Sequence, residues 1–300
     1  MKTLITGALG ATEEEIRQLS ALGLDITLHP DERQSVEHPE QYEAVVCNGL
    51  FTFHDIATFT RLRHIQLTSA GYDRAPLDYI QAHNIKIYNA AGVYSVPMAE
   101  FALCGVLQLS KQSKFFFENQ KQHRWEKHRG LFELAGKTVC IVGCGNVGNA
   151  CASRFHAMGC RVIGVNRSPK QDPLYDHIFP LSQLHQALTG SDIVVLSIAL
   201  TDETRHLMDH SALSAMKPGA VLVNLARGAI VDTDALIPAL HSHLGGAVLD
   251  VFEEEPLSPD SPLWDMEQVV LTPHNSFVGE GNHRRLMEII VNNLSEYTEV

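Results

Sequence analysis

The 300-residue sequence is short of positive charge. Lys and Arg number 23 against 35 Asp and Glu, which gives a formal net charge of -12. Such a surplus of negative charge repels phosphate backbones and anionic lipid headgroups unless a basic patch is set apart. The nearest approach to a patch is Arg61, Arg63 and His64, a short cluster flanked by apolar residues. The composition therefore argues against nucleic acid and membrane surfaces as partners.

Two further absences concern membranes and metals. No stretch approaches the roughly 18 consecutive apolar residues of a membrane span, and the N-terminal segment turns acidic at residues 13–15 instead of continuing as a signal peptide. The six cysteines lack the paired C-x2-C spacing of zinc sites. We therefore expect buried reduced thiols, no bound metal and a cytoplasmic location.

The length and the order of apolar segments predict two α/β domains. Single hydrophobic cores stop growing at about 250 to 300 residues, so this chain is long for one core. Strand-like and helix-like segments alternate along nearly the whole chain, which is typical of parallel sheets covered by helices on both faces. A capping box of Thr12 and Glu15 predicts a helix that runs to Gly23, and apolar spacing predicts a last helix over residues 283–297. Strands are expected at residues 4–6, 25–28, 44–47, 64–67 and 85–88, and six more at 138–142, 161–165, 193–196, 221–224, 247–251 and 268–271.

A glycine-rich turn follows the buried segment 138–142. Gly143 suits a tight turn, Gly145 lets the backbone approach a pyrophosphate, and Gly148 lets the following helix pack close to the strand. The helix start then presents free N–H groups to the phosphates. The sequence therefore predicts a dinucleotide site, with binding residues Gly143, Gly145, Asn146, Val147 and Gly148.

The end of the next predicted strand bears on the choice of nucleotide. NAD-specific sites usually have a carboxylate there for the ribose 2'-hydroxyl, but this chain has Asn166, Arg167 and Ser168. An arginine with amide and hydroxyl neighbours can hold a 2'-phosphate by charge-assisted hydrogen bonds. The residues favour NADP(H), with NAD as the alternative in which Asn166 serves the hydroxyls and Arg167 is a solvated loop residue.

Polar residues follow three later strands, in segments 224–228, 250–256 and 271–275. Strand ends of an open parallel sheet border the crevice that holds the cofactor, so Arg227, Glu255 and His274 are expected to converge there. Each alone has an ordinary explanation, as a turn residue, a solvated acid or a capped loop histidine. Together, at the ends of three strands of a dinucleotide-binding sheet, they are predicted to form a catalytic set.

Four motifs occur in an order typical of one enzyme family: the turn 143–148, the stretch from 216–220 to 224–228, the block 250–256, and Thr272-Pro273-His274. On these motifs nearly the whole chain resembles the D-isomer-specific 2-hydroxyacid dehydrogenases. The resemblance implies a Rossmann-type doubly wound parallel sheet over residues 96–276. This domain would be inserted into a flavodoxin-like α/β substrate domain made of residues 1–95 and 277–300. It also implies a homodimer, with the contact in the aromatic-rich region after residue 96.

The implied activity is hydride transfer between a nicotinamide dinucleotide and the alpha carbon of a small 2-oxo acid or (R)-2-hydroxy acid. Arg227 would bind the substrate carboxylate and polarise the carbonyl, while His274 donates a proton to the carbonyl oxygen. Glu255, hydrogen-bonded to His274, would stabilise the protonated ring and fix its orientation. Asp250 resembles the family's ligand for the nicotinamide carboxamide, and Ala226 also falls among the cofactor-binding positions.

In the first domain, the segment 68–73 resembles the family loop whose backbone N–H groups hold the substrate carboxylate. Ala70 and Gly71 are the donors that the resemblance names. The sequence departs from the family at residues 197–201 and 275–277, which leaves the substrate's identity open. The first expectation is a glyoxylate or hydroxypyruvate reductase. The alternatives are a phosphoglycerate dehydrogenase and, from another class, a nucleotide-sensing protein like the family's corepressors.

Overall fold

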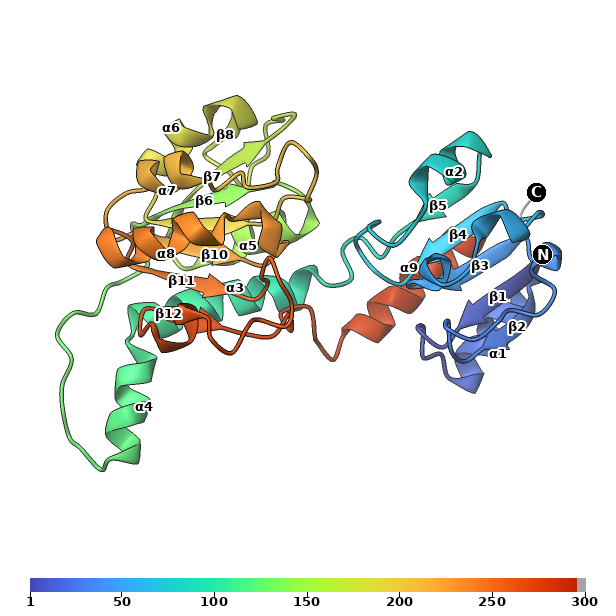
Figure 1. Ribbon diagram of the computed structural model, residues 1–300, viewed down its shortest axis with the longest axis horizontal. Coiled ribbons are helices and arrows are strands. Elements are labelled where there is room, and N and C mark those ends of the chain that lie inside the picture. Colours follow the sequence, from blue (N-terminus) through green and yellow to red (C-terminus); the bar gives the residue numbers. More distant parts are fainter. Residues whose placement is uncertain (296–300) are drawn as a thin grey trace. The chain divides into compact units, whose positions relative to one another are not determined.

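The computed structural model describes residues 1–295, which form two compact units (Figure 1). Unit 1 combines Met1–Tyr94 with the chain from Gly279 onward, and unit 2 is Ser95–Val278. The sequence predicted crossings after residues 95 and 276, and the units divide after residues 94 and 278. Each unit has its own parallel sheet. No helix within residues 1–295 is long and apolar enough to cross a membrane.

Unit 1 is built on five parallel strands in the order β2-β1-β3-β4-β5. This order is flavodoxin-like, and the predicted fold class is confirmed. The strands are β1 (Lys2–Thr6), β2 (Asp25–His29), β3 (Ala44–Cys47), β4 (His64–Leu67) and β5 (Lys86–Tyr88). The helices are α1 (Glu13–Ala21), α2 (Leu77–Ala82) and α9 (Asn282–Ser295), with short 3-10 turns η1 (Pro39–Gln41), η2 (Leu50–Thr52) and η3 (Ile56–Thr58).

Helix α9 completes the core of unit 1 although it comes from the far end of the sequence. Its apolar face contacts the β1 and α1 side of the sheet through Leu286, Met287, Ile290 and Leu294. The predicted capping box is present at the start of α1, where the Glu15 carboxylate accepts the Thr12 N–H at 2.8 Å. Residues 296 and 297 of the predicted last helix lie outside the described residues.

Unit 2 has seven parallel strands in the order β12-β11-β10-β9-β6-β7-β8. They are β6 (Thr138–Val142), β7 (Arg161–Asn166), β8 (His177–Pro180), β9 (Ile193–Leu196), β10 (Val221–Asn224), β11 (Gly246–Leu249) and β12 (Val269–Leu271). The expectation of six strands was wrong because β8 has no alternating or continuous apolar pattern. It is a four-residue edge strand that ends in Pro180 and pairs with β7 alone.

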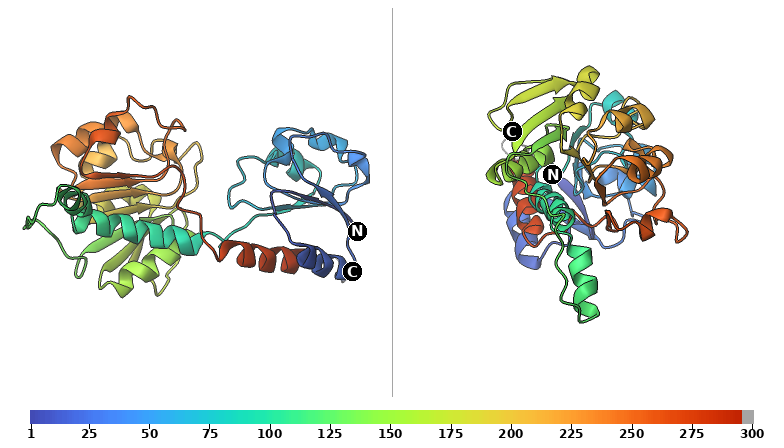
Figure 2. Two further views of the ribbon diagram at one scale, coloured as in Figure 1. Left: turned by 90° about the horizontal axis from the view of Figure 1, so that it is seen from below. Right: turned by 90° about the vertical axis from the view of Figure 1, so that its left-hand side faces the viewer.

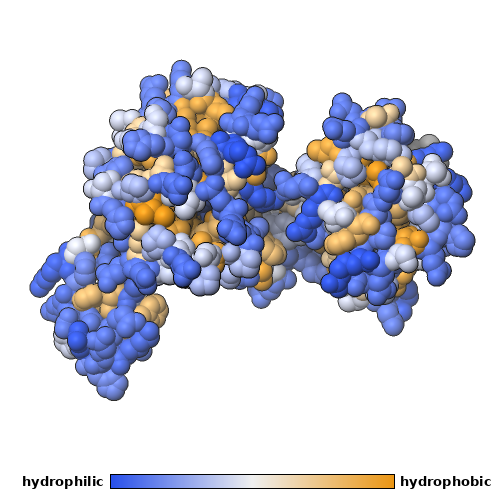
Figure 3. Space-filling view, viewed as in Figure 1, coloured by the Kyte–Doolittle hydropathy of each residue, from blue (hydrophilic) through white to orange (hydrophobic). Residues whose placement is uncertain are grey.

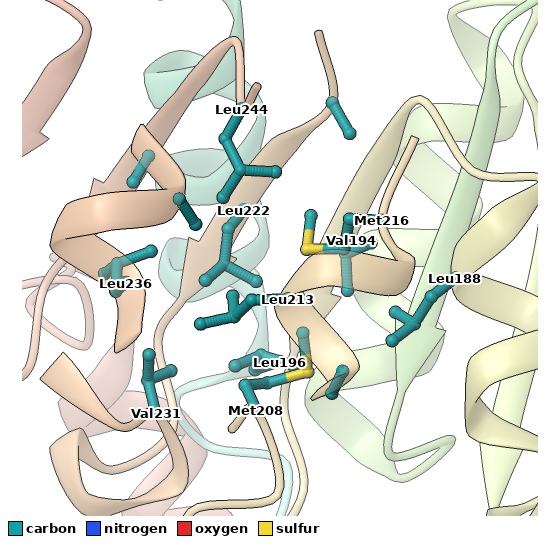
Figure 4. Close-up of a cluster of buried hydrophobic side chains, with 14 of the residues drawn as sticks. Leu188, Val194, Leu196, Met208, Leu213, Met216, Leu222, Val231, Leu236 and Leu244 are labelled. Carbon is teal, nitrogen blue, oxygen red and sulfur yellow. The ribbon is translucent and has the colours of Figure 1, made fainter. Parts of the chain in front are cut away.

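Helices cover both faces of this sheet (Figure 2). Helices α3 (Ser95–Ser110) and α5 (Asn146–Ala157) pack on one face, against Val139 and Ile141 of β6. Helices α6 (Leu184–Thr189), α7 (His210–Ala215) and α8 (Thr233–Ser242) cover the other face, as Figure 4 shows for Leu213, Leu222 and Leu236. Short 3-10 turns are η4 (Leu181–Gln183), η5 (Gly228–Ile230) and η6 (Pro262–Asp265). Successive strand side chains enter opposite cores, which explains why these strands read as continuous apolar runs.

Helix α4 (Ser113–Lys121) extends away from the sheet of unit 2 (Figure 1). It lies in the aromatic-rich region after residue 96, where the resemblance implied the dimer contact. The Lys114 Nζ donates to the carbonyl of Met266 at 3.3 Å and also to that of Val269, which ties the start of α4 to the β12 edge. The chain from residue 124 to 133 then returns without helix or strand.

Candidate active site

The glycine turn after β6 forms a cradle that admits no side chains at two positions. Gly143 has φ +102°, and the Ser197 Oγ donates to its carbonyl at 2.8 Å. A Cβ at Gly148 would lie 2.1 Å from that same carbonyl oxygen, so only glycine lets α5 pack this close. At Gly145 a Cβ would meet nothing within 4 Å, which leaves open space beside the backbone.

The start of α5 supplies hydrogen-bond donors to this space. Gly145 is the N-cap and has no side chain to satisfy the first turn. The N–H groups of Asn146, Val147 and Gly148 have no acceptor within residues 1–295. Free N–H groups and the positive end of the helix dipole favour a phosphate at this place. The cradle therefore fits the pyrophosphate of a dinucleotide.

The thiol inside this turn is not activated. Cys144 Sγ points toward the carbonyl of Val165, at 3.7 Å. Burial raises the pKa of this thiol to about 11. A helix start can lower a thiol pKa, but here burial outweighs it. Cys144 therefore fills the gap between the turn and β7.

The end of β7 carries the residues that the sequence predicts for the 2'-position of the ribose. The side chain of Asn166 accepts the N–H of Arg167 at 3.1 Å, and both Arg167 and Ser168 are exposed. The first acidic residue after β7 is Asp172, six positions beyond its end at Asn166. This edge therefore has a cation and no adjacent carboxylate.

The three strands that precede the predicted catalytic residues are neighbours in the sheet. Asn224 of β10 pairs with Leu249 of β11, and Leu249 pairs with Leu271 of β12. Because the register is level, the loops that follow these strands start at the same edge. The structure thereby brings the segments of Arg227, Glu255 and His274 to one side of unit 2.

The loop that carries Arg227 is held by a side chain that the sequence analysis did not single out. Asn224 accepts the N–H of Ala226 at 3.1 Å and donates to the carbonyl of Arg227 at 3.0 Å. A Cβ at Gly228 would lie 1.8 Å from the Phe252 carbonyl carbon, so this loop touches the one after β11. A polar residue at the end of an apolar strand is the sequence signal that could have singled out Asn224.

His274 and Glu255 form the predicted pair. The distance from His274 Nδ1 to Glu255 Oε2 is 2.9 Å. The other carboxylate oxygen, Oε1, accepts the N–H of Phe252 at 3.0 Å. With Nδ1 held by a carboxylate, the Nε2 atom is the ring nitrogen that can exchange a proton with a substrate.

Asp250 holds the loop of His274 by several hydrogen bonds. Its side chain is fully buried, and its carboxylate accepts hydrogen bonds from Thr272 Oγ1 at 2.7 Å, Asn275 N at 2.8 Å and Ser276 N at 2.9 Å. The Asp250 carbonyl accepts the N–H of His274 at 2.7 Å. Sequence analysis gave Asp250 only a cofactor contact and did not single out Thr272, because these bonds join residues more than 20 positions apart.

A second carboxylate steadies the loop after β11. Glu253 Oε1 lies 2.5 Å from His206 Nε2, and Oε2 accepts the N–H of Thr233 at 2.9 Å. Burial alone would raise the pKa of the Glu253 carboxyl, but the hydrogen bonds from Thr233 and His206 hold it below its ordinary value. Glu253 thus supports the loop, while its neighbour Glu255 contacts His274.

Ala70 and Gly71 lie in unit 1, in the loop that follows β4. The loop begins with a hydrogen bond from Thr68 N to the Cys47 carbonyl at 2.8 Å. Within the part of the chain that the structure describes, the N–H groups of Ala70 and Gly71 donate to no acceptor. They are therefore available to an anion.

Comparisons with known proteins agree with this geometry. Residues 103–276 match the family model "D-isomer specific 2-hydroxyacid dehydrogenase, NAD binding domain". The chain is 34% identical to an (S)-sulfolactate dehydrogenase of Chromohalobacter salexigens, over 80% of this chain and 78% of the relative. It is also 34% identical to a glyoxylate reductase of Aeropyrum pernix, over 80% and 74% of the two chains.

Among solved structures, the chain is similar to a D-isomer specific 2-hydroxyacid dehydrogenase from Xanthobacter autotrophicus, determined in complex with NADPH. The TM-score is 0.81 at 31% identity, and the match covers 99% of this chain and 94% of that one. The family model, the curated relatives and this structure agree on one reaction class. The chain belongs to the D-isomer specific 2-hydroxyacid dehydrogenase family and is an NAD(P)-dependent oxidoreductase of 2-oxo and 2-hydroxy acids.

Proposed function

We propose that the protein is a reductase of a small 2-oxo acid such as glyoxylate or hydroxypyruvate. The observation that carries this proposal is the His274–Glu255 pair, with 2.9 Å between Nδ1 and Oε2, at the same sheet edge as Arg227 and the glycine cradle. The relative from Aeropyrum pernix, a glyoxylate reductase, supports the choice of substrate.

In this mechanism the protein binds the 2-oxo acid, polarises its carbonyl and supplies one proton. Ala70 and Gly71 hold the carboxylate with their N–H groups, and Arg227 contacts both the carboxylate and the carbonyl oxygen. His274 Nε2 donates a proton to that oxygen, and Glu255 keeps the ring oriented through Nδ1. A nicotinamide cofactor held at residues 143–148 would, when bound, supply the hydride for the alpha carbon.

We propose that NADPH is preferred over NADH. The glycine cradle of residues 143–148 would hold the pyrophosphate of either nucleotide. Asn166, Arg167 and Ser168 would surround the 2'-position, where the absence of an adjacent carboxylate favours a phosphate. Ala226 and Asp250 would also hold the cofactor, Asp250 at its nicotinamide carboxamide. The NADPH complex of the Xanthobacter autotrophicus relative supports this preference.

Phosphoglycerate oxidation is less well supported. A phosphate needs cations at the loop 68–73, and the candidates are Arg61, Arg63 and Arg74. Arg61 and Arg63 precede β4, at the opposite end of that strand, so Arg74, which follows the loop, is the one of the three at this end. Arg61 also lies 3.4 Å from the Glu43 carboxylate. The nucleotide-sensing alternative does not require the paired His274 and Glu255 that the structure contains.

We propose that the protein forms a homodimer through α4 and the chain that follows it. Trp125 is 97% exposed and Phe117 is 61% exposed, and Figure 3 shows apolar atoms among polar ones on this projecting part. Arg124, Lys127 and Arg129 add positive charge in a chain of net charge -12, which suits contact with a second copy. The expectation of buried thiols was wrong for Cys104, which is exposed, while Cys47, Cys140, Cys151 and Cys160 are buried. Free cysteines suit a reducing cytoplasm.

Initial rates of the purified protein test the proposed reaction. NADPH and NADH are each assayed with glyoxylate, hydroxypyruvate and pyruvate, and NADP⁺ and NAD⁺ are each assayed with 3-phosphoglycerate for the reverse reaction. We expect NADPH oxidation by glyoxylate or hydroxypyruvate, and loss of most turnover in His274→Ala with NADPH affinity retained. Unchanged turnover in His274→Ala would remove His274 from the role of proton donor.

A further inference from the structure

The loop after β4 has an unusual hydrogen-bonding pattern. Four consecutive carbonyl oxygens in it each accept a hydrogen bond from a donor outside the regular sheet ladder. These bonds run to Thr68 O from Tyr94 Oη, to Ser69 O from Ala90 N at 2.9 Å, to Ala70 O from Asn89 Nδ2 at 2.6 Å, and to Gly71 O from Ser69 Oγ at 3.0 Å.

Three of the four donors belong to one segment, residues 89–94, which follows β5. Because β5 pairs with β4 and Tyr88 is level with Gln66, this segment leaves the sheet beside the loop. Asn89 is the residue that begins it. The orientation of its amide is defined by two partners, since Oδ1 accepts the Ala91 N–H at 3.2 Å and Nδ2 donates to the Ala70 carbonyl.

The bonds to the carbonyls decide which polar groups of the loop remain available. Each peptide presents a carbonyl and an N–H in opposite directions, so fixing the carbonyl fixes the N–H that shares its plane. The Ala70 carbonyl, which Asn89 holds, shares its peptide plane with the Gly71 N–H. This N–H and that of Ala70 donate to no acceptor within residues 1–295. Successive free N–H groups make an anion-binding concavity.

We propose that Asn89 is a positioning residue for substrate binding, which sets the direction of the Gly71 N–H by holding the Ala70 carbonyl. The inference rests on the proposed function, in which this loop binds the carboxylate of the 2-oxo acid. Asn89 itself does not contact the substrate. Its contribution is to order the loop before the anion binds, so that binding loses less conformational entropy.

The variant Asn89→Asp separates this role from simple packing. A carboxylate has the same shape as the amide and still accepts the Ala91 N–H, but it cannot donate to the Ala70 carbonyl. Two acceptors then face each other, and the peptide plane turns away. Asn292→Asp is the matched control, because Asn292 is exposed on α9 in the same unit and the charge change is identical.

Oxalate serves as the carboxylate probe because its binding needs no turnover. The dissociation constant of oxalate is measured by calorimetry on the protein saturated with NADPH, together with KM and kcat for glyoxylate. We expect Asn89→Asp to raise the oxalate dissociation constant and the KM at least tenfold. We expect kcat to change less than threefold and the NADPH dissociation constant less than twofold. Asn292→Asp should match the wild type.

An oxalate affinity within twofold of the wild type in Asn89→Asp would overturn the assignment. Asn89→Ala removes the same donor to the Ala70 carbonyl without adding a charge, and it serves also if Asn89→Asp fails to fold. A threefold or larger loss of oxalate affinity in Asn89→Ala supports the assignment, and an unchanged affinity overturns it. A wild type that reduces no 2-oxo acid overturns the proposed function, while the oxalate titration still decides the role of Asn89.

Discussion

His274 adopts a left-handed backbone conformation, with φ +52°, that few residues other than glycine favour. Such a conformation costs on the order of 1 kcal/mol or more and persists where surrounding bonds determine it. The bonds here come from Asp250, whose carboxylate holds Thr272, Asn275 and Ser276 on either side of the histidine. The backbone conformation of His274 therefore depends on one buried carboxylate, that of Asp250.

Removing one of the hydrogen bonds to Asp250 tests whether the position of His274 depends on them. In Thr272→Val the side-chain shape is kept, but the donor to Asp250 Oδ1 is lost, which costs about 1 kcal/mol. We expect kcat for glyoxylate to fall about tenfold because the ring loses alignment. Thr272→Ser keeps the hydroxyl and should stay within about twofold of the wild type. Equal rates in the two variants would contradict the role of this bond.

Arg167 offers a second test with a single side chain. A hydrogen bond to a charged group contributes about 1.5 to 3 kcal/mol, so Arg167→Ala should weaken NADPH binding about 10- to 100-fold. NADH has no 2'-phosphate, and its affinity should change less than about twofold. Fluorescence titration measures both. Lys170→Ala removes the same charge from an exposed position three residues away, and an equal effect of that variant would show general electrostatics instead of a specific contact.

At the scale of elements, two glycines of the turn from β6 to α5 are expected to serve different purposes, one in folding and the other in nucleotide binding. An alanine at Gly148 would place its Cβ 2.1 Å from the Gly143 carbonyl oxygen, whereas one at Gly145 would meet nothing within 4 Å. We expect Gly148→Ala to lower the free energy of unfolding by about 3 kcal/mol or more. Gly145→Ala should cost less than about 1 kcal/mol.

Nucleotide affinity should distinguish the two variants in a different way, because Gly145→Ala is expected to fold and yet to bind NADPH weakly. The Cβ of Gly145→Ala would occupy the space left for the pyrophosphate, so we expect a folded protein with NADPH affinity reduced at least about tenfold. Urea unfolding and fluorescence titration on the same samples give both quantities. A folded Gly145→Ala protein with wild-type affinity would place the pyrophosphate elsewhere.

The sequence predicted most of these elements because both sheets are parallel and buried. Buried parallel strands read as apolar runs, and the glycine turn and strand-end motifs stand at fixed positions relative to them. Strand β8 was missed because an edge strand ending in Pro180 has no such pattern. Arg227, Glu255 and His274 were predicted from strand ends. The bonds from Asn224, Asp250 and Asn89 were not predicted, because each depends on atomic contacts made only in the folded chain.

At the scale of the whole molecule, one buried histidine makes the stability of unit 1 depend on pH. Burial lowers the pKa of His64 to about 4, and the ring stacks on Tyr88 at 5.1 Å between centroids. The unfolded state then binds a proton at higher pH than the folded state. The stability that neutral His64 provides is present above pH 6.5 and is lost as the pH falls toward 4. The full loss is about 3 kcal/mol.

Replacing the histidine should remove this dependence. His64→Phe keeps a ring beside Tyr88 and does not titrate, so its unfolding free energy should fall less than that of the wild type between pH 7 and pH 5. Both tryptophans, Trp125 and Trp264, lie in unit 2, so hydrogen exchange of β3 and β4 is the suitable measurement. Parallel curves for the two proteins would exclude His64 as the source.

The proposed dimer is tested at the same scale. The double variant Phe117→Ser with Trp125→Ser removes the two most exposed apolar side chains of the α4 region. We expect sedimentation velocity to show a dimer for the wild type and a monomer for the double variant. Trp264→Ser, at a tryptophan 52% exposed elsewhere in unit 2, is the control and should remain dimeric.

The contribution of α9 to the core of unit 1 determines an order of events during synthesis. The residues of unit 2 are contiguous, so this unit has all its strands once residue 278 has left the ribosome. The sheet of unit 1 emerges first, yet the apolar surface around Ile5, Leu19 and Val93 is covered only when α9 follows. The earlier-made half of the protein must therefore remain unfinished while the later half folds, and during that interval its uncovered surface is a target for chaperones.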